Sequence, residues 1–284
     1  MKDSVEQGKS IGLIAGEGDL PALVAMSARE LGYRVVSIAL FSDAFNSLQP
    51  YSDSNYSLGI GQSGKILKTL KAERVKDVII IGKVDKKVVF DKFRFDMRAI
   101  KLLARVRNNN DNTLMKEIEK EFVKEGMSII DQASFLSDLS VPEGVLTRRA
   151  PTPEEMRDLG YGFGLAKGIG RLDVGQTVVV RDRAVLAVEA IEGTDDAIKR
   201  GCSLAGNGAV VVKVSKPGQD LRMDIPVVGL QTIMNMAQGN AVALGLEAGK
   251  TLLVNRDEAL NKAYQAGIAI IGLSESSIAD LEHE

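Results

Sequence analysis

The start of the chain alternates short apolar runs with segments that place apolar residues at helical spacing. The runs 11–15, 33–41 and 78–81 predict strands, residues 20–31 predict a helix, and residues 59–71 predict a turn followed by a helix. Strands that alternate with helices are typical of a parallel sheet joined by crossover helices. The pattern therefore predicts a Rossmann-like sheet.

The pattern changes after the third of these strands. Apolar residues recur at helical spacing from residue 93 to 123, with a break at the three asparagines 108–110, so two helices are expected. Residues 127–130 predict one more short strand, and the polar stretch 42–57 predicts a loop. These elements complete an N-terminal domain over residues 1–137.

The second part of the chain follows a stretch without sustained periodicity. Residues 138–153 contain three prolines and predict a linker. A second, C-terminal α/β domain is expected over residues 154–284, with a ligand cleft between the two domains. The elements predicted in it are strands at 177–180, 185–190, 209–214, 251–254 and 268–273 and helices from 195, over 233–248 and over 257–266.

Composition supports this division and limits the partners. At 284 residues the chain exceeds the size at which one core usually keeps growing, and 45% hydrophobic with 26% charged residues is typical of a packed protein. A net charge of −2 provides no general attraction for nucleic acid, so no nucleic-acid partner is expected. Neither a spanning segment nor a secretory signal is recognisable, which favours the cytoplasm.

Histidine and cysteine are nearly absent. The chain has one of each, Cys202 and the penultimate residue His283. Nucleophile pairs with histidine, zinc sites of the HExxH type and histidine-rich two-metal sites therefore cannot be built. Hard-cation chemistry on oxygen ligands, typically Mg²⁺, or catalysis on a bound organic cofactor remains.

Two glycine-containing turns are candidate phosphate sites. Gly16 and Gly18 lie between a predicted strand and a helix, where backbone N–H groups can hold an anion, although a plain tight turn explains them equally well. The third glycine of a dinucleotide motif is replaced by Pro21, which weakens a nicotinamide interpretation. Gly64 and Lys65 end a GxxxxGK pattern that lacks the following Ser or Thr, so an ATPase is not expected.

The segment from Lys83 to Arg107 forms a positive island. It holds nine basic against three acidic side chains and carries an apolar stripe. A basic amphipathic segment is often only a solvated face, and the alternative is docking at an anionic lipid surface. Both interpretations stay open on the sequence.

Carboxylates gather in the second domain after strand-like segments. Glu189 and Glu192 follow a predicted strand, and Asp195 lies in the first turn of a helix that Thr194 is expected to cap. The helix dipole alone accounts for acids at that position, which is the simpler explanation of Asp195. Asp224 precedes Ile225 and Pro226, and partial burial there would suit it to general-base catalysis.

Several separated motifs, in order, resemble one known family. They are Ile-Gly-Leu-Ile-Ala-Gly from residue 11, the glycine turn at 59–66, Ile-Gly-Arg-Leu-Asp-Val-Gly-Gln from 169, residues 185–195 and Arg-Met-Asp-Ile-Pro-Val-Val-Gly from 222. Over nearly its whole length the chain is similar to the UDP-2,3-diacylglucosamine pyrophosphatases of the LpxI kind. A local departure is Gly-Lys-Val at 82–84 where the family has a Gly-Asn-Val type of sequence.

The resemblance implies a function. The family hydrolyses UDP-2,3-diacylglucosamine in lipid A biosynthesis, with water attacking the α-phosphorus to release UMP and 2,3-diacylglucosamine 1-phosphate. It implies Mg²⁺ dependence, a two-domain fold that holds the lipid between the domains, and an essential aspartate that falls on Asp224. Glu189, Glu192 and Asp195 are candidate Mg²⁺ ligands. The candidate substrate-binding residues are Gly16, Gly18, Gly64, Lys65, Lys83, Thr194, Lys213, Arg222 and Thr232.

The partners implied are the lipid-linked nucleotide sugar and, peripherally, the inner face of the cytoplasmic membrane, and a homo-oligomer is left open. One alternative is a nucleotide-binding regulatory protein without catalysis, which the glycine turns would equally support. A nicotinamide oxidoreductase is the third and least expected reading, because its motif is incomplete.

Overall fold

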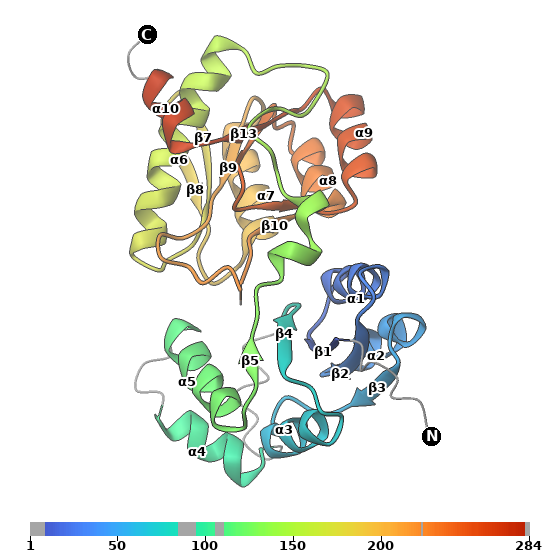
Figure 1. Ribbon diagram of the computed structural model, residues 1–284. Coiled ribbons are helices and arrows are strands. Elements are labelled where there is room, and N and C mark those ends of the chain that lie inside the picture. Colours follow the sequence, from blue (N-terminus) through green and yellow to red (C-terminus); the bar gives the residue numbers. More distant parts are fainter. Residues whose placement is uncertain (1–8, 85–94, 106–110, 223, 282–284) are drawn as a thin grey trace. The chain divides into compact units, whose positions relative to one another are not determined.

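The computed structural model describes residues 9–84, 95–105, 111–222 and 224–281 (Figure 1). The chain forms two compact units. The first consists of Met1–Ser137 together with Asp220–Asp224, and the second of Asp138–Gln219 together with Ile225–Glu284. One short segment from the second half of the sequence, which contains Asp224, therefore belongs to the first unit.

The first unit is built on a five-stranded sheet in the order β3-β2-β1-β4-β5, and every strand pair in it is parallel. This order is that of a Rossmann-like half-fold and confirms the predicted α/β class. The strands are β1 (Ser10–Ala15), β2 (Arg34–Ala39), β3 (Ser54–Ser57), β4 (Asp77–Ile81) and β5 (Ser128–Ile129).

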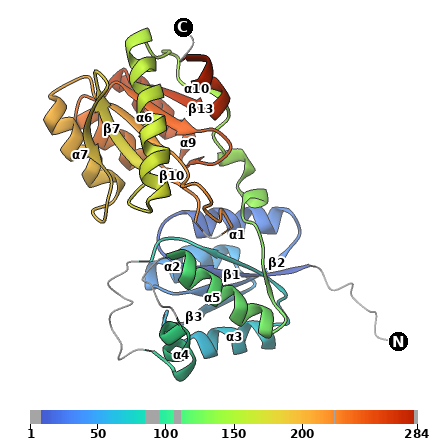
Figure 2. The same ribbon diagram turned by 90° about the vertical axis from the view of Figure 1, so that its left-hand side faces the viewer.

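Helices cover both faces of this sheet. Side chains alternate between the faces of a strand, so Ile14 and Val36 join an apolar cluster with Leu67 of α3 and Phe122 of α5. Helix α1 lies on the opposite side from α3 and α4 (Figure 2). The helices are α1 (Leu20–Glu30), α2 (Ser42–Leu48), η1 (Gln49–Tyr51), α3 (Ser63–Ala72), α4 (Met97–Arg105), α5 (Asp111–Lys124) and η4 (Ala133–Phe135).

The stretch 42–57, predicted as a loop, is not one. It contains α2, η1 and β3. Strand β3 is the edge strand of the sheet, and its Ser-Asn-Tyr-Ser sequence is only partly buried, so the apolar run that marks the central strands is missing. The prediction failed because an edge strand needs no continuous apolar run.

The second unit is built on a six-stranded mixed sheet in the order β6-β13-β11-β9-β7-β8. The central strands β9, β11 and β13 are parallel, whereas β6, β7 and β8 pair antiparallel. The strands are β6 (Gly144–Val145), β7 (Thr177–Arg181), β8 (Ala184–Val188), β9 (Val210–Lys213), β11 (Ala243–Glu247) and β13 (Ala269–Leu273), and a separate pair is formed by β10 (Val227–Val228) and β12 (Leu252–Leu253).

Each face of this second sheet has its own core. Helices α6 and α10 lie on one side and α7, α8 and α9 on the other (Figure 1). Leu159 and Phe163 of α6 pack on one face, whereas Ile198 of α7 and Ile233 of α8 pack on the other. The helices are η5 (Ser137–Leu139), α6 (Pro153–Arg171), α7 (Thr194–Ala205), α8 (Leu230–Gln238), α9 (Arg256–Ala266) and α10 (Glu275–Leu281).

Two boundaries in this unit differ from the sequence-based prediction. Residues 138–153, predicted as the linker, belong to the second unit, because β6 pairs with β13 and Arg149 donates to the carbonyl oxygen of Val242 (2.5 Å). The predicted helix 233–248 is two elements, α8 and the fully buried strand β11. A strand buried on both faces carries no alternation, so periodicity alone does not separate it from a helix.

Among the described residues, no helix combines the length and the apolar character that crossing a membrane requires.

Candidate functional site

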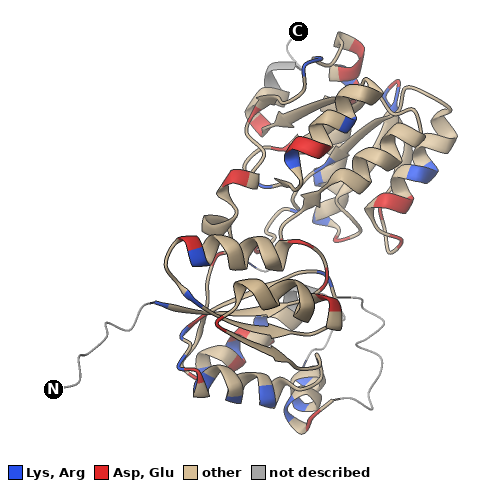
Figure 3. Cartoon of the chain, turned by 90° about the vertical axis from the view of Figure 1, so that its right-hand side faces the viewer, with Lys and Arg blue, Asp and Glu red and all other residues tan. Residues whose placement is uncertain are grey.

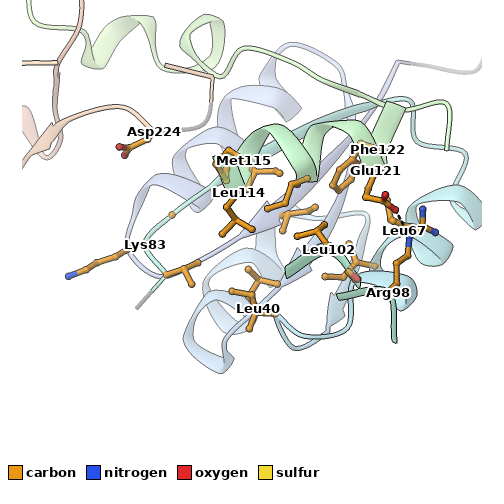
Figure 4. Close-up of a pocket in the computed structure, with 18 residues that line it drawn as sticks. Leu40, Leu67, Lys83, Arg98, Leu102, Leu114, Met115, Glu121, Phe122 and Asp224 are labelled. Atoms are coloured by element: carbon orange, nitrogen blue, oxygen red, sulfur yellow. Dashed lines mark hydrogen bonds and ion pairs between the residues drawn. The ribbon is translucent and has the colours of Figure 1, made fainter. Parts of the chain in front are cut away.

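A cavity of about 430 Å³ lies in the first unit between the sheet and helices α3, α4 and α5 (Figure 4). Its walls are mostly apolar and come from strands β1 and β4 and from the three helices. The apolar wall residues include Leu40, Ile66, Leu67, Leu102, Leu114, Met115 and Phe122. A cavity of this size and character suits a long apolar ligand.

The two ends of this cavity are polar. Lys83 and Asp224 line one end, and Arg98 and Glu121, which form an ion pair, line the other (Figure 4). Both Lys83 and Asp224 are exposed, so the expected partial burial of Asp224 is wrong. Its carboxylate is therefore accessible to water at one end of the cavity.

Arg222 anchors the segment that carries Asp224. Its guanidinium donates to Glu119 of α5 (2.9 Å) and to Asp220 (2.6 Å), and Gln132 donates to the carbonyl oxygen of Leu221 (3.1 Å). The hydrogen bond to Asp220, followed by that to Glu119, raises the pKa of Arg222 above its ordinary value. Arg222 was predicted to bind substrate, and the structure gives it these protein partners.

The first glycine turn connects two backbone segments. The Gly16 N–H donates to the carbonyl of Ile81 (2.8 Å), and Glu17 and Lys83 exchange two backbone hydrogen bonds of 2.8 Å. A Cβ on Gly16 would lie 2.5 Å from the carbonyl oxygen of Lys83, so the close approach requires glycine. The Gly16 amide is thus used inside the fold, and it fixes Lys83 at the cavity. Gly18 is exposed, with a φ of 99° and open space around it.

At the second glycine turn, a carboxylate of the protein itself occupies the anion-binding position. The carboxylate of Asp96 accepts from the N–H of Gly64 (2.8 Å), the hydroxyl of Ser63 (3.2 Å) and the N–H groups of Arg98 (3.1 Å) and Ala99 (2.8 Å). Burial raises the pKa of Asp96, but these donors outweigh burial and leave the pKa below its ordinary value. Asp96 therefore occupies the N-terminus of α3 where a phosphate was predicted. Lys65 is exposed beside it.

A second polar group lies at the carboxyl edge of the sheet in the second unit. The hydroxyl of Thr194 donates to Glu189 (2.7 Å), and Lys213, at the end of β9, donates to Thr194 (3.0 Å) and to the carbonyl oxygen of Val227 (2.9 Å). Glu189 and Lys213 are both buried. Gly193 is the N-cap of α7, so the cap predicted for Thr194 is wrong, and its hydroxyl serves Glu189 instead.

Helices α7 and α8 begin side by side at the same edge. The hydroxyl of Thr232 donates to the carboxylate of Asp195 (3.0 Å). Next to Lys213 in the sheet, Thr177 is fully buried, and its hydroxyl has no hydrogen-bond partner among the described residues. In α/β folds the carboxyl edge of parallel strands is where ligands bind, and helix N-termini favour anions. This edge thus brings together three of the predicted substrate-binding residues, Thr194, Lys213 and Thr232.

The predicted metal ligands do not form a ligand set. Glu192 is ion-paired with Arg200 (2.6 Å) and accepts from the N–H of Ala190 (3.1 Å), and backbone hydrogen bonding and Arg200 lower its pKa. Glu189 and Asp195 accept from the two threonines described above. Within the part of the chain that the structure describes, no group of three or more His, Cys, Asp or Glu is placed to hold a metal ion. The residues predicted for Mg²⁺ therefore do not fit it as a trio.

One buried ion pair was not predicted. Lys167 of α6 donates to Glu247 at the end of β11 (2.8 Å), and Glu247 also accepts from Lys250 (2.8 Å) and from the N–H of Ser215 (2.8 Å). Burial raises the pKa of Glu247, but these donors outweigh burial and lower the pKa below its ordinary value. The sequence signal, a lone acid ending an apolar run, was hidden in the segment assigned to a helix.

Two family models match the chain, one after the other. The LpxI N-terminal domain matches residues 10–139, and the LpxI C-terminal domain matches residues 142–271. The chain belongs to the LpxI family. A relative from Caulobacter vibrioides, UDP-2,3-diacylglucosamine pyrophosphatase LpxI, is 34% identical over 276 residues, which are 93% of this chain and 98% of the relative.

Solved structures resemble the chain only distantly. UDP-glucose 4-epimerase from Stenotrophomonas maltophila, with bound NAD, is 10% identical and covers 89% of this chain and 92% of its own, with a TM-score of 0.31. N5-carboxyaminoimidazole ribonucleotide synthetase with ADP is 21% identical over 53% of this chain and 40% of its own, with a TM-score of 0.24. TM-scores this low carry no argument about fold or function.

One segment is assigned differently by the LpxI domain matches and by the compact units of the structure. The match to the LpxI C-terminal domain includes Asp224, whereas the structure assigns Asp220–Asp224 to the first unit. The anchor is Arg222, whose partners Glu119 and Ile129 lie in the LpxI N-terminal match. A residue from the C-terminal sequence thus lines a cavity built by the N-terminal one.

Proposed function

We propose that the chain is a hydrolase that cleaves UDP-2,3-diacylglucosamine at the α-phosphate, giving UMP and 2,3-diacylglucosamine 1-phosphate in lipid A biosynthesis. The observation that carries the proposal is the cavity of the first unit, with an apolar interior and the exposed carboxylate of Asp224 at one end. The family membership and the name of the Caulobacter relative support the same substrate.

Asp224 is proposed as the general base. Water attacks the α-phosphorus, the bond from phosphorus to the bridging oxygen breaks, and the lipid phosphate leaves with that oxygen. Asp224 takes the proton from the attacking water, a role that contributes typically 10²–10⁴-fold to rate. Its exposed position lets water reach it.

The apolar cavity is proposed to hold acyl chain. A methylene group occupies about as much space as a water molecule, ~30 Å³, so a cavity of 430 Å³ has room for roughly a dozen methylenes. That is one acyl chain of the substrate and not two. Lys83, at the same end as Asp224, is the cation that would face the diphosphate.

The carboxyl edge of the second unit is proposed to bind the nucleotide. Lys213 supplies positive charge, Thr194 and Thr232 supply hydroxyl groups, and two helix N-termini begin there. These groups suit the phosphates of UDP. The ligand cleft predicted between the two domains stays a prediction.

Mg²⁺ dependence is part of the proposal, although the three carboxylates predicted as its ligands do not gather. Mg²⁺ is commonly held by substrate phosphates together with one or two carboxylates, and the diphosphate would supply most of its ligands here. When bound, the ion would neutralise phosphate charge. Excess EDTA should abolish hydrolysis and added Mg²⁺ should restore it; full activity in EDTA would remove the metal from the proposal.

Peripheral association with the inner face of the cytoplasmic membrane is also proposed. Helix α4 exposes Met97 (70%) and Ile100 (46%) beside the exposed Lys101. Of the positive island, Lys83, Arg98, Lys101 and Arg105 lie in the described residues, and Figure 3 shows basic and acidic residues mixed on the helices of this unit. Co-sedimentation with anionic vesicles should fall for Met97→Ser; unchanged sedimentation would assign the island to a solvated face.

The test of the proposal is product release. Purified full-length chain is incubated with UDP-2,3-diacylglucosamine in detergent micelles, and UMP is measured by chromatography. Stoichiometric UMP with 2,3-diacylglucosamine 1-phosphate supports the hydrolase. Tight binding of the nucleotide without release would instead favour the non-catalytic nucleotide-binding alternative. Release of UDP in place of UMP would contradict cleavage between the two phosphates. With isotope-labelled water the label should enter UMP, because attack at the β-phosphorus would give the same two products with the label in the sugar phosphate.

A further inference from the structure

The far end of the cavity is closed by a fixed group of charges. Glu121, only 7% exposed, accepts hydrogen bonds from Arg98 (2.9 Å), Arg105 (2.8 Å) and Lys124 (2.7 Å). Arg98 donates in addition to Glu125 (2.8 Å). The hydrogen bond from Lys124, followed by those from Arg105 and Arg98, lowers the pKa of Glu121 to about 2, so the group stays charged.

This end differs from every other wall of the cavity. Apart from Ser63 and Gly82, the side walls are aliphatic and aromatic side chains, which can change rotamer around a ligand. The end with Lys83 and Asp224 is exposed. Arg98 and Glu121 lie opposite that end (Figure 4), and their hydrogen bonds to one another and to α5 hold them in place.

An acyl chain that enters from the exposed end therefore meets a charged wall. Each methylene buried before the wall should strengthen binding about fourfold, because about 0.8 kcal/mol is gained per methylene. A methyl group pushed further would displace the hydrogen bonds of a buried carboxylate, and unsatisfied buried charge is costly. The gain should stop and reverse at that length.

We infer that the Arg98–Glu121 ion pair sets the longest acyl chain that the cavity accepts, and is thereby a chain-length determinant of this hydrolase. The inference rests on the proposed function and adds to it a specificity. The cavity volume places the limit at roughly a dozen methylenes.

The experiment compares a series of substrates whose acyl chains grow by two methylenes at each step. For the wild-type protein, kcat/KM should rise with chain length to a maximum and then fall. In the double variant Arg98→Ala/Glu121→Ala the wall is removed without leaving a lone buried charge, and the maximum should move to longer chains. An unchanged maximum in the folded double variant, or a wild-type profile without any maximum, overturns the inference.

A matched control and a second variant accompany the double variant. Glu117→Ala/Lys120→Ala removes another ion pair of α5 (2.5 Å) outside the cavity lining, and it should keep the wild-type maximum. Should the double variant fail to fold, Arg98→Ala alone is used, because Glu121 keeps Arg105 and Lys124 as partners. Its maximum should move in the same direction, and a fixed maximum counts against the inference.

A binding measurement separates this inference from the proposed function. Calorimetry with 2,3-diacylglucosamine 1-phosphate of each chain length measures the affinity of the cavity for the acyl chain without any turnover. If no substrate is hydrolysed but the affinity still peaks at one length and the peak moves in Arg98→Ala, the proposed hydrolysis fails and the length limit stands. If hydrolysis occurs but neither affinity nor turnover depends on chain length, the proposed length limit is wrong and the proposed hydrolase activity is supported.

Discussion

The two units use the ends of their parallel strands in opposite ways. In the first unit, the backbone donors that a phosphate would need are engaged by the protein, Gly16 by Ile81 and Gly64 by Asp96. In the second unit, the corresponding edge presents side chains, with Lys213, Thr194 and Thr232 gathered where α7 and α8 begin. The glycine turns of the first unit are thus engaged by the protein itself beside an apolar cavity, whereas the second unit offers the edge at which we propose that the nucleotide binds.

The largest effect expected from this contrast is on nucleotide affinity at the edge of the second unit. Lys213→Met should weaken UMP binding by about 10- to 100-fold, because a hydrogen bond to a charged group contributes about 1.5–3 kcal/mol. Calorimetry measures it, with circular dichroism to confirm folding. Lys199→Met, an exposed lysine of α7, is the control and should bind UMP normally. Equal affinity in both variants would remove the anion site from this edge.

A smaller effect, on stability, is expected at the first glycine turn. Gly16→Ala forces a Cβ against the Lys83 carbonyl and should destabilise the first unit by about 1–3 kcal/mol in urea unfolding. Gly59→Ala has open space and should change stability by less than about 0.5 kcal/mol. If Gly16→Ala were as stable as the wild type and lost nucleotide affinity instead, the turn would be a phosphate site.

The smallest effect is expected where Asp96 caps two helices. Asp96→Ala should cost about 1 kcal/mol at neutral pH, the usual cost of losing such a cap. The pKa of Asp96 is lowered in the folded protein, so its contribution is present above the ordinary carboxyl pKa and is lost as pH falls through the lowered value. Urea unfolding at several pH values should show the wild type and the variant converging in acid. A gap that widens in acid would contradict the assignment.

Much of the fold could be predicted from apolar patterning, and the exceptions have physical causes. Central strands such as β1 and β4 are continuous apolar runs, whereas the polar edge strand β3 gave no such signal. Strand β11 is buried on both faces and was merged with the preceding helix. Helix α6 was missed although Thr152 and Glu155 form a capping box at its start, a signal that was available.

The site was less accessible to sequence reasoning. Asp224 was singled out by its neighbours and by the resemblance, but its packing in the first unit depends on Arg222 meeting Glu119, 103 residues away. Glu192 and Asp195 were grouped because they are close in the sequence. In the structure Glu192 pairs with Arg200, whereas Asp195 accepts a hydrogen bond from Thr232. The cavity was not foreseen, because its walls come from strands and helices far apart in the chain.

Asp224, at the end of an apolar cavity, is the residue that we propose activates water for attack on the lipid-linked diphosphate. The most direct measurement is kcat for UMP release by Asp224→Asn, beside the control Asp43→Asn, an exposed carboxylate of α2 away from the cavity lining. We expect a loss of about 10²–10⁴-fold for Asp224→Asn and wild-type turnover for the control. Near-normal turnover by a folded Asp224→Asn protein would contradict it.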